Sequence, residues 1–202
     1  MAESIIQLPA PTNKLRTWNR TIGANSVETE AMWLEDPHDA SYTFSTGGIV
    51  TTTALSHLVA INAGATLPVR IRYIRGTQLA APAAVASLEL QLIRTTTAAP
   101  TGGTVITARP TDSADNPAGA TAMTLPTVKA TVGVTIGDQA QFLFTGAIPG
   151  LAKWEWTWYP ANGSKPLIIP AGVVNGIAVT NPLALATASI VWEIGFAEAS
   201  FV

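Results

Sequence analysis

The chain has 202 residues and a formal net charge of −2, and 48% of its residues are hydrophobic whereas only 12% are charged. The charge balance provides no basic field for nucleic acid, and no run of about 18 apolar residues is present to span a membrane. The absence of cysteine excludes disulfides, thiolate catalysis and cysteine-ligated zinc. A charged fraction about half that of an average domain predicts a surface that is shared with partners.

Residues 1–25 are predicted to form an extended N-terminal arm. Pro9 and Pro11 interrupt regular structure, and the segment lacks the basic start and long apolar run of a secretion signal. A disordered tail would not normally carry so many apolar groups. Two interpretations stay open: the arm packs on its own domain, or it reaches a neighbouring subunit. Its candidate interface residues are Leu15, Trp18 and Ile22.

Residues 26–202 are predicted to form one all-β domain, an antiparallel β-sandwich of jelly-roll type, without a convincing helix. Short apolar or threonine-rich segments alternate with Gly- and Pro-rich links, which is typical of this class. We expect about eight to ten strands. The candidate segments are residues 27–34, 49–61, 69–74, 88–92, 105–108, 128–136, 141–144, 152–159, 167–169, 176–180 and 189–196.

The stretch from Thr95 to Pro126 has little hydrophobic patterning, and we predict one strand flanked by long exposed loops, a common site of binding contacts. Asp112, Asp115 and Asn116 supply oxygen ligands within this stretch. They lack the alternating acids, central glycine and distal glutamate of a calcium loop. An Asx turn therefore explains them better than a metal does.

The segment Lys153 to Tyr159 alternates strictly, with Trp154, Trp156 and Trp158 at every second position. On a strand these three side chains share one face, and no helix would group them so. They predict either a core or subunit interface, joined by Trp192 of the last strand, or a carbohydrate-stacking platform. The polar residues on the opposite face favour the first interpretation.

No residue set is found that would run a reaction, and the chain is predicted not to be an enzyme. His38 lies in an Asp-Pro-His-Asp turn that matches no metal-ligand spacing, and His57 lies in an apolar strand. Glycosidases need two carboxylates across a cleft, and Glu155 and Glu193, which could be neighbours across a sheet, are the only pair to consider. We interpret them as the polar partners of the tryptophans. No cofactor or metal is predicted.

Arg70 and Arg72 share a strand face and form, with Arg75 and Arg94, the only basic concentration. They could face solvent, pair with acids across a subunit interface, or bind a nucleic-acid backbone. The net charge of −2 argues against nucleic acid as a partner.

Several segments resemble the small β-sandwich virion proteins of tailed bacteriophages, most of all capsid cement (decoration) proteins. The resemblance is carried by residues 87–115, 165–172, 176–179 and 191–194. It implies a jelly-roll-like domain, often trimeric, on the outer surface of the capsid, where it joins neighbouring subunits of the major capsid protein. It also implies synthesis in the host cytoplasm, and it supplies no catalytic residues.

The sequence therefore predicts a non-enzymatic structural protein of the virion that stabilises the phage head as a homotrimer. The alternatives are a receptor-binding, carbohydrate-binding module of a tail or fibre, and a cellular glycan-binding or hydrolytic β-sandwich.

Overall fold

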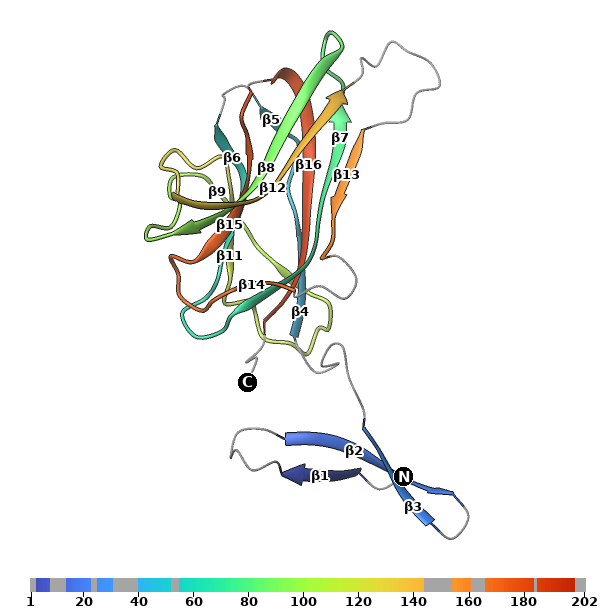
Figure 1. Cartoon of the computed structure of the whole chain (residues 1–202). Helices are drawn as coiled ribbons and strands as arrows, with labels where there is room; N and C mark the ends of the chain where they lie inside the picture. The colour runs from blue at the N-terminus through green and yellow to red at the C-terminus, as the bar shows by residue number, and fades with distance from the viewer. Residues whose placement is uncertain are drawn as a thin grey trace. The chain divides into compact units, whose positions relative to one another are not determined.

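The structure is a computed structural model that describes residues 3–7, 14–22, 25–30, 40–51, 55–143, 154–160, 166–183 and 185–198. Every regular element in these residues is a β-strand. The chain divides into two compact units, of which the first contains β1–β3 and the second spans Ala40–Ala199. Figure 1 shows the course of the chain and the strand labels.

The N-terminal unit contains three antiparallel strands in the order β1-β2-β3: β1 (Glu3–Gln7), β2 (Lys14–Ile22) and β3 (Asn25–Glu30). The sequence placed the domain boundary at residue 25, at the start of β3. The structure pairs β3 with β2 instead, from Ile22↔Asn25 to Thr17↔Glu30. Only two residues separate the two strands in the sequence, and such short links favour hairpin pairing.

The second unit is a sandwich of a seven-stranded and a six-stranded sheet. The seven-stranded sheet contains β4 (Ala40–Ser45), β5 (Ile49–Thr51), β7 (Val69–Ala80), β10 (Arg109–Pro110), β13 (Glu155–Trp158), β14 (Leu167–Ile169) and β16 (Leu185–Glu198). The six-stranded sheet contains β6 (Ser56–Asn62), β8 (Ala86–Thr96), β9 (Thr104–Ile106), β11 (Thr121–Thr124), β12 (Thr131–Leu143) and β15 (Gly176–Asn181).

The pairing of these strands is that of a jelly roll. Working inward from the ends of the unit, β4 and β5 pair with β16, β6 with β15, β7 with β13 and β14, and β8 with β12, all antiparallel. The chain therefore behaves as one long hairpin rolled into two sheets, as expected for this architecture. The predicted all-β, jelly-roll-like sandwich is confirmed.

Several predicted segments have a different structure. The two segments predicted over residues 128–136 and 141–144 are one strand, β12. The single strand predicted over residues 49–61 is two strands, because β5 pairs in the seven-stranded sheet and β6 in the six-stranded one. Leu55, between them, has a left-handed φ of 56°. The stretch from Thr95 to Pro126 contributes three short strands rather than one: β9 and β11 extend the six-stranded sheet, and β10 joins β4.

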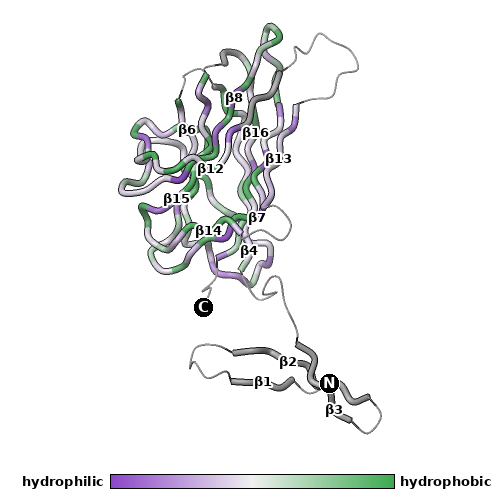
Figure 2. Tube along the Cα trace, viewed as in Figure 1, coloured by the Kyte–Doolittle hydropathy of each residue, from purple (hydrophilic) through white to green (hydrophobic). Residues whose placement is uncertain are grey.

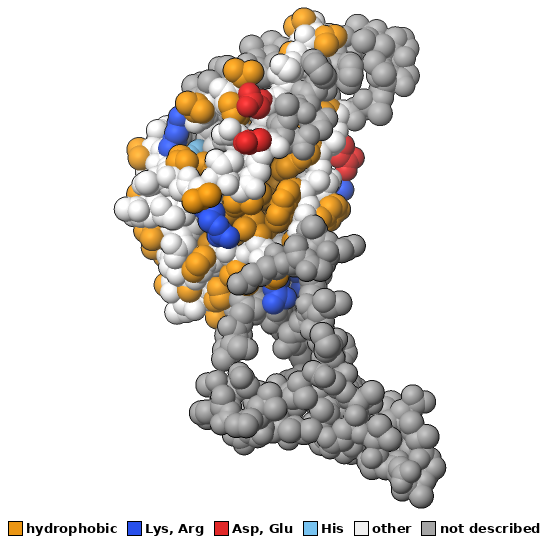
Figure 3. Space-filling view, in the orientation of Figure 1, with side chains coloured by type: hydrophobic (Ala, Val, Ile, Leu, Met, Phe, Trp, Pro, Cys, Tyr) orange, Lys and Arg blue, Asp and Glu red, His pale blue; other side chains and the backbone are white. Residues whose placement is uncertain are grey.

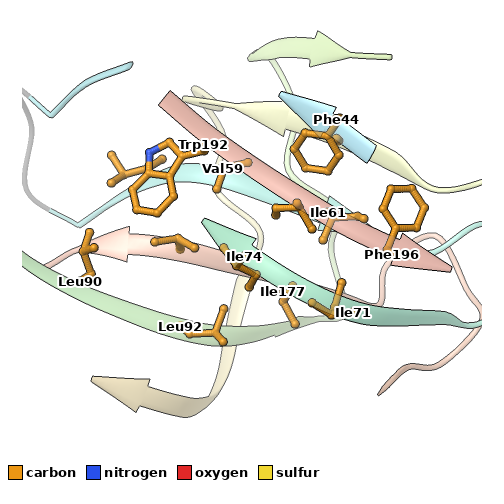
Figure 4. Packing of buried hydrophobic residues seen from close by; sticks show 14 of the residues in the cluster. Phe44, Val59, Ile61, Ile71, Ile74, Leu90, Leu92, Ile177, Trp192 and Phe196 are labelled. Carbon is orange, nitrogen blue, oxygen red and sulfur yellow. The ribbon is translucent and has the colours of Figure 1, made fainter. Parts of the chain in front are cut away.

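The core lies between the two sheets. Alternation along β7 puts Val69 and Ile71 inside and Arg70 and Arg72 outside. Figure 2 shows the hydropathy of the residues along each strand of the sandwich. Figure 4 shows side chains from both sheets converging, including Trp192 and Phe196 of β16, both at most 1% exposed. Gly76 lacks a side chain where a Cβ would lie 2.7 Å from the Trp192 ring, so this close approach requires glycine.

Candidate functional site

The outer face of the seven-stranded sheet carries a compact polar cluster. Three adjacent strands, β16, β7 and β13, place Glu193, Arg75 and Glu155 on this face. Glu193 lies directly opposite Arg75 in the ladder, and Glu155 lies opposite Thr77, two residues further along β7 on the same face. The sequence alternation therefore brings together the two carboxylates that sequence analysis identified as a pair.

Arg75 lies between the two carboxylates. Its Nε is 3.8 Å from Glu155 Oε1, and its Nη2 is 3.9 Å from Glu193 Oε2. Tyr73 Oη donates a hydrogen bond of 2.5 Å to Glu193 Oε1. Burial, followed by the hydrogen bond to Glu193 and its charge, raises the pKa of Tyr73 to about 12. Glu193 therefore contacts both a phenol donor and a guanidinium, and this arrangement favours a structural polar network over proton transfer.

An exposed aromatic ring borders this cluster. Tyr159, just after β13, is 64% exposed, and its ring centroid lies 6.3 Å from that of Tyr73 in a tilted arrangement. Gly195 makes room for Tyr73, because a Cβ there would overlap the phenol ring. The result is a surface of two tyrosines and three charged groups, a composition common in binding interfaces.

A groove of about 760 Å³ lies beside the cluster, between β4 of one sheet and β9 of the other. Its floor includes Phe44 and Ile49, and its rim is rich in hydroxyl side chains. Arg109 and Glu193 are its charged lining residues, so Glu193 belongs to both the groove and the cluster. The remaining lining residues are Thr43, Ser45, Thr46, Gly47, Thr104, Val105, Ile106, Thr107 and Thr124.

Two strand edges border the groove. Among the described strands, β10 pairs with the outer edge of β4 at Tyr42 and Thr43, Thr111 donates to the Ser41 carbonyl, and β9 pairs only with β11. The backbone groups of Ser45 and of β9 that face away from these partners need water or another chain to hydrogen bond with. A groove bounded in this way suits an extended polypeptide, which would add a strand and place alternate side chains on the apolar floor.

The tryptophans lie on the inner face of the sandwich, as their alternation predicts. Trp192 is fully buried, Trp154 is 5% exposed, and the ring centroid of Trp156 is 6.1 Å from that of Trp192 in an edge-on contact. Trp156 and Trp158 are half-buried. With Leu90, Leu92, Gly137 and Asp138 they line an apolar cleft of about 70 Å³.

That cleft lies where both sheets end, at β13 and β12. Figure 3 shows hydrophobic side chains at the surface in this region. Trp156 and Trp158 therefore close the edge of the sandwich. A stacking platform would need exposed indole faces, and the burial of Trp154 and Trp192 does not provide them.

The arginines do not form a single basic site. Arg70 and Arg72 are half-buried on β7, on the outer face at the end of the sheet where β14 pairs. Arg94 extends from β8 across to the other sheet, where its Nη1 donates to the Ile168 carbonyl at 2.9 Å. Arg75 belongs to the cluster with the glutamates.

Other predicted site residues have the following places. In the pairing of β2 with β1 and β3, Trp18 and Ile22 occupy positions on one face of the N-terminal sheet, and Leu15 occupies a position on the other face. His38 lies outside the described residues. The Asp112 carboxylate accepts the Ala114 N–H at 2.9 Å, the local bond of an Asx turn.

The described part of the chain holds no group of three or more His, Asp or Glu side chains arranged for a metal ion. Nor do these residues include a helix that is long and apolar enough to cross a membrane.

Glu198 is a buried charged residue that sequence analysis did not single out. It is 5% exposed, and its carboxylate accepts the backbone N–H groups of Gly119 at 2.9 Å and Ala120 at 2.5 Å. The bonds fix the link between β10 and β11 on the sandwich. Its position at the end of an alternating strand gave no signal of this role, because the partners are backbone groups about 80 residues away.

Comparison with known proteins gives no relative: no protein-family model, no curated protein and no solved structure matches this chain.

Proposed function

We propose that the chain is a non-enzymatic structural protein of a tailed-phage virion, a capsid cement protein that binds the major capsid protein and stabilises the head. In this proposal it acts as a homotrimer on the outer surface of the capsid after synthesis in the host cytoplasm. Three copies that bind together gain avidity without a tight individual contact.

The observation that carries the proposal is the groove between the edges of β4 and β9. Strand edges favour the backbone of a neighbouring protein over a small substrate. The jelly roll is compatible with this role because it builds many viral capsid domains, although it also builds lectin and enzyme domains. The paired charges around Arg75 support binding rather than catalysis, since both carboxylates share one cation.

The N-terminal unit is the proposed capsid anchor. A three-stranded sheet alone buries little apolar surface and gains stability from packing against another surface. Because β3 pairs with β2, a clean truncation removes residues 1–39 and leaves the unit Ala40–Ala199 with its own core.

Two measurements test this proposal. Light scattering over a dilution series should show a stable trimer, and the protein should co-sediment with capsids assembled from the cognate major capsid protein. Deletion of residues 1–39 should leave a folded domain that no longer co-sediments. Full retention of capsid binding by the truncated domain would rule out the anchor, and the absence of binding by the intact chain would rule out the cement role.

The groove is tested with a matched pair of variants. Val105, on its rim, is 66% exposed, and Val85, outside the groove lining, is 56% exposed. Val105→Asp should weaken capsid binding about tenfold or more, whereas Val85→Asp should leave it unchanged. Equal effects of the two substitutions would show that the groove does not make the contact.

A second candidate function is carbohydrate binding by a tail or fibre module. It is favoured by Tyr159, whose exposed ring lies beside Tyr73 and the carboxylates of Glu155 and Glu193. Aromatic faces stack on sugar rings, and carboxylates accept sugar hydroxyls. Reproducible glycan-array signals that disappear in a folded Tyr159→Ala variant would favour this function over the capsid role.

A further inference from the structure

Two links cross the outer face of the six-stranded sheet. β11 and β12 lie on opposite sides of β6, β15 and β8, and only residues 125–130 join them. Four strand spacings of about 4.8 Å separate β11 from β12 by roughly 19 Å, and seven extended steps of about 3.3 Å cover roughly 23 Å. The inner face is filled by the core, so this link, which we call the strap, lies nearly extended on the outer face.

The second link, residues 97–103, joins β8 to β9 and runs beside the strap. Thr101 and Val128 exchange backbone hydrogen bonds of 3.0 and 3.1 Å. Gly103 approaches the strap so closely that a Cβ on Gly103 would lie 2.9 Å from Pro126 Cα. The two links therefore form a cover that is held together by backbone contacts.

The cover accounts for burial on a face that a two-sheet sandwich would otherwise expose. Ala60, Ala178 and Ile93 lie in one row across β6, β15 and β8, on the side opposite the core. Their exposures are 1%, 1% and 3%, and they form a second, separate hydrophobic cluster. The strap thus hides an apolar row.

His57 lies on the same face, where β6 pairs with Thr180 of β15. Its backbone carbonyl accepts the N–H of Leu125, the first residue of the strap, at 3.2 Å. Its side chain is 1% exposed, and neither ring nitrogen has a hydrogen-bond partner. Leu125 itself has a left-handed φ of 44°, an unfavourable conformation for leucine. The strap is therefore anchored beside a buried, unsatisfied imidazole.

The charges around His57 oppose its protonation. Lys129, on the strap, is the charged group that influences the His57 imidazole. The residue paired with His57 on β15 is the neutral Thr180. Further across the sheet, Thr180 pairs with Gln91 of β8, and Gln91 pairs with Asp138 of β12. Burial first, and Lys129 second, lower the pKa of His57 below its ordinary value of 6.5. The closed strap thus requires a neutral imidazole.

We propose that His57 is a proton-sensitive latch: its protonation in mild acid releases residues 125–130 and uncovers the apolar row Ala60, Ala178 and Ile93. An imidazolium would be charged, buried and without an acceptor, and the charge of Lys129 would repel it. Opening the strap hydrates the imidazolium and separates it from the lysine.

The direction of the pH dependence follows from the lowered pKa. Above pH 6.5 the imidazole is neutral in both the closed and the open form, and the strap keeps its full stability. As the pH falls below 6.5 the open form takes up the proton first, so closure weakens. The stability of the closed strap falls until the pH reaches the lowered pKa that His57 has in the closed form. For each unit by which closure lowers the pKa of His57, the opening equilibrium constant increases about tenfold.

Hydrogen–deuterium exchange of the full-length protein tests the latch. After correction for the intrinsic pH dependence of exchange, peptides that cover residues 125–130 should lose protection between pH 7.5 and pH 5. Peptides from β7 and β16, in the other sheet, should keep theirs. His57→Leu, which cannot be protonated, should abolish the acid-dependent loss, and His38→Gln should retain it.

A second substitution keeps the test decisive if His57→Leu does not fold. Lys129→Gln removes the nearby cation, so it should raise the pKa of His57 toward 6.5 and reduce the acid-dependent loss. Equal protection of the wild-type strap at both pH values would overturn the latch. An acid-dependent loss of the same size in wild type and Lys129→Gln, or in wild type and His57→Leu, would also overturn it.

Discussion

The two outer faces of the sandwich differ in what covers them. On the seven-stranded sheet, Tyr73, Arg75, Glu155 and Glu193 satisfy one another at the surface. On the six-stranded sheet the strap covers small apolar residues and an unsatisfied histidine. One face is a polar surface available to partners, and the other is a second buried layer.

The difference shows that sheet alternation alone does not decide burial. Both faces are composed of the residues that alternate with the core, but the connection from β11 to β12 passes over only one of them. The His57 imidazole on the covered face has lost water without gaining a partner, whereas the polar cluster on the open face keeps both. Substitutions on the two faces should therefore have very different costs.

The largest effect is expected under the strap. Ile93→Ala should lower the free energy of unfolding by about 2–5 kcal/mol, as for a core position, because Ile93 is only 3% exposed. Urea denaturation measures this as a lower midpoint with an unchanged slope. Leu79→Ala is the control: Leu79 lies on β7 and is 58% exposed, so the change should stay within about 0.5 kcal/mol. Similar costs at both positions would mean that the strap does not bury Ile93.

Much of the sandwich follows from local sequence pattern. The strict alternation at Trp154, Trp156 and Trp158 predicts an inward-facing row, and the ladder of β13 with β7 has that register. The all-β class and most strand positions follow in the same way, because period-two burial is a local property.

The parts that could not be predicted depend on long-range pairing. The segment 49–61 reads as one strand, yet the chain changes sheet near Leu55. The pairing of β3 with β2, and the strap over His57, are likewise set by which strands become neighbours. Glu155 and Glu193 were recognised as possible neighbours, but the positions of Arg75 and Tyr73 between and beside them require the register of three strands.

An intermediate effect is expected on the open face at Tyr73. Tyr73→Phe removes the hydrogen bond to Glu193 and should cost about 1 kcal/mol, because the carboxylate can turn to water. The pKa of Tyr73 is raised to about 12, so its contribution is complete below pH 10 and is lost as the pH rises from 10 to 12. Stability curves of wild type and Tyr73→Phe should therefore converge in that range.

Absorbance titration of the tyrosinates checks the same point independently. The chain has three tyrosines, and Tyr73→Phe should remove a phenol that ionises near pH 12. If the high-pH part of the titration curve is unchanged in the variant, the hydrogen bond to Glu193 does not persist in solution.

The smallest effect is expected at Arg75. Its two ion pairs are long, at 3.8 and 3.9 Å, and its side chain is 46% exposed, so water and salt screen them. Arg75→Gln should change the unfolding free energy by less than about 0.5 kcal/mol at physiological salt, and high salt should erase the difference. A cost above that of Tyr73→Phe, insensitive to salt, would contradict the contrast between an open and a covered face. It would show that the cluster is shielded from solvent in the native protein and that a partner or another copy covers this face too.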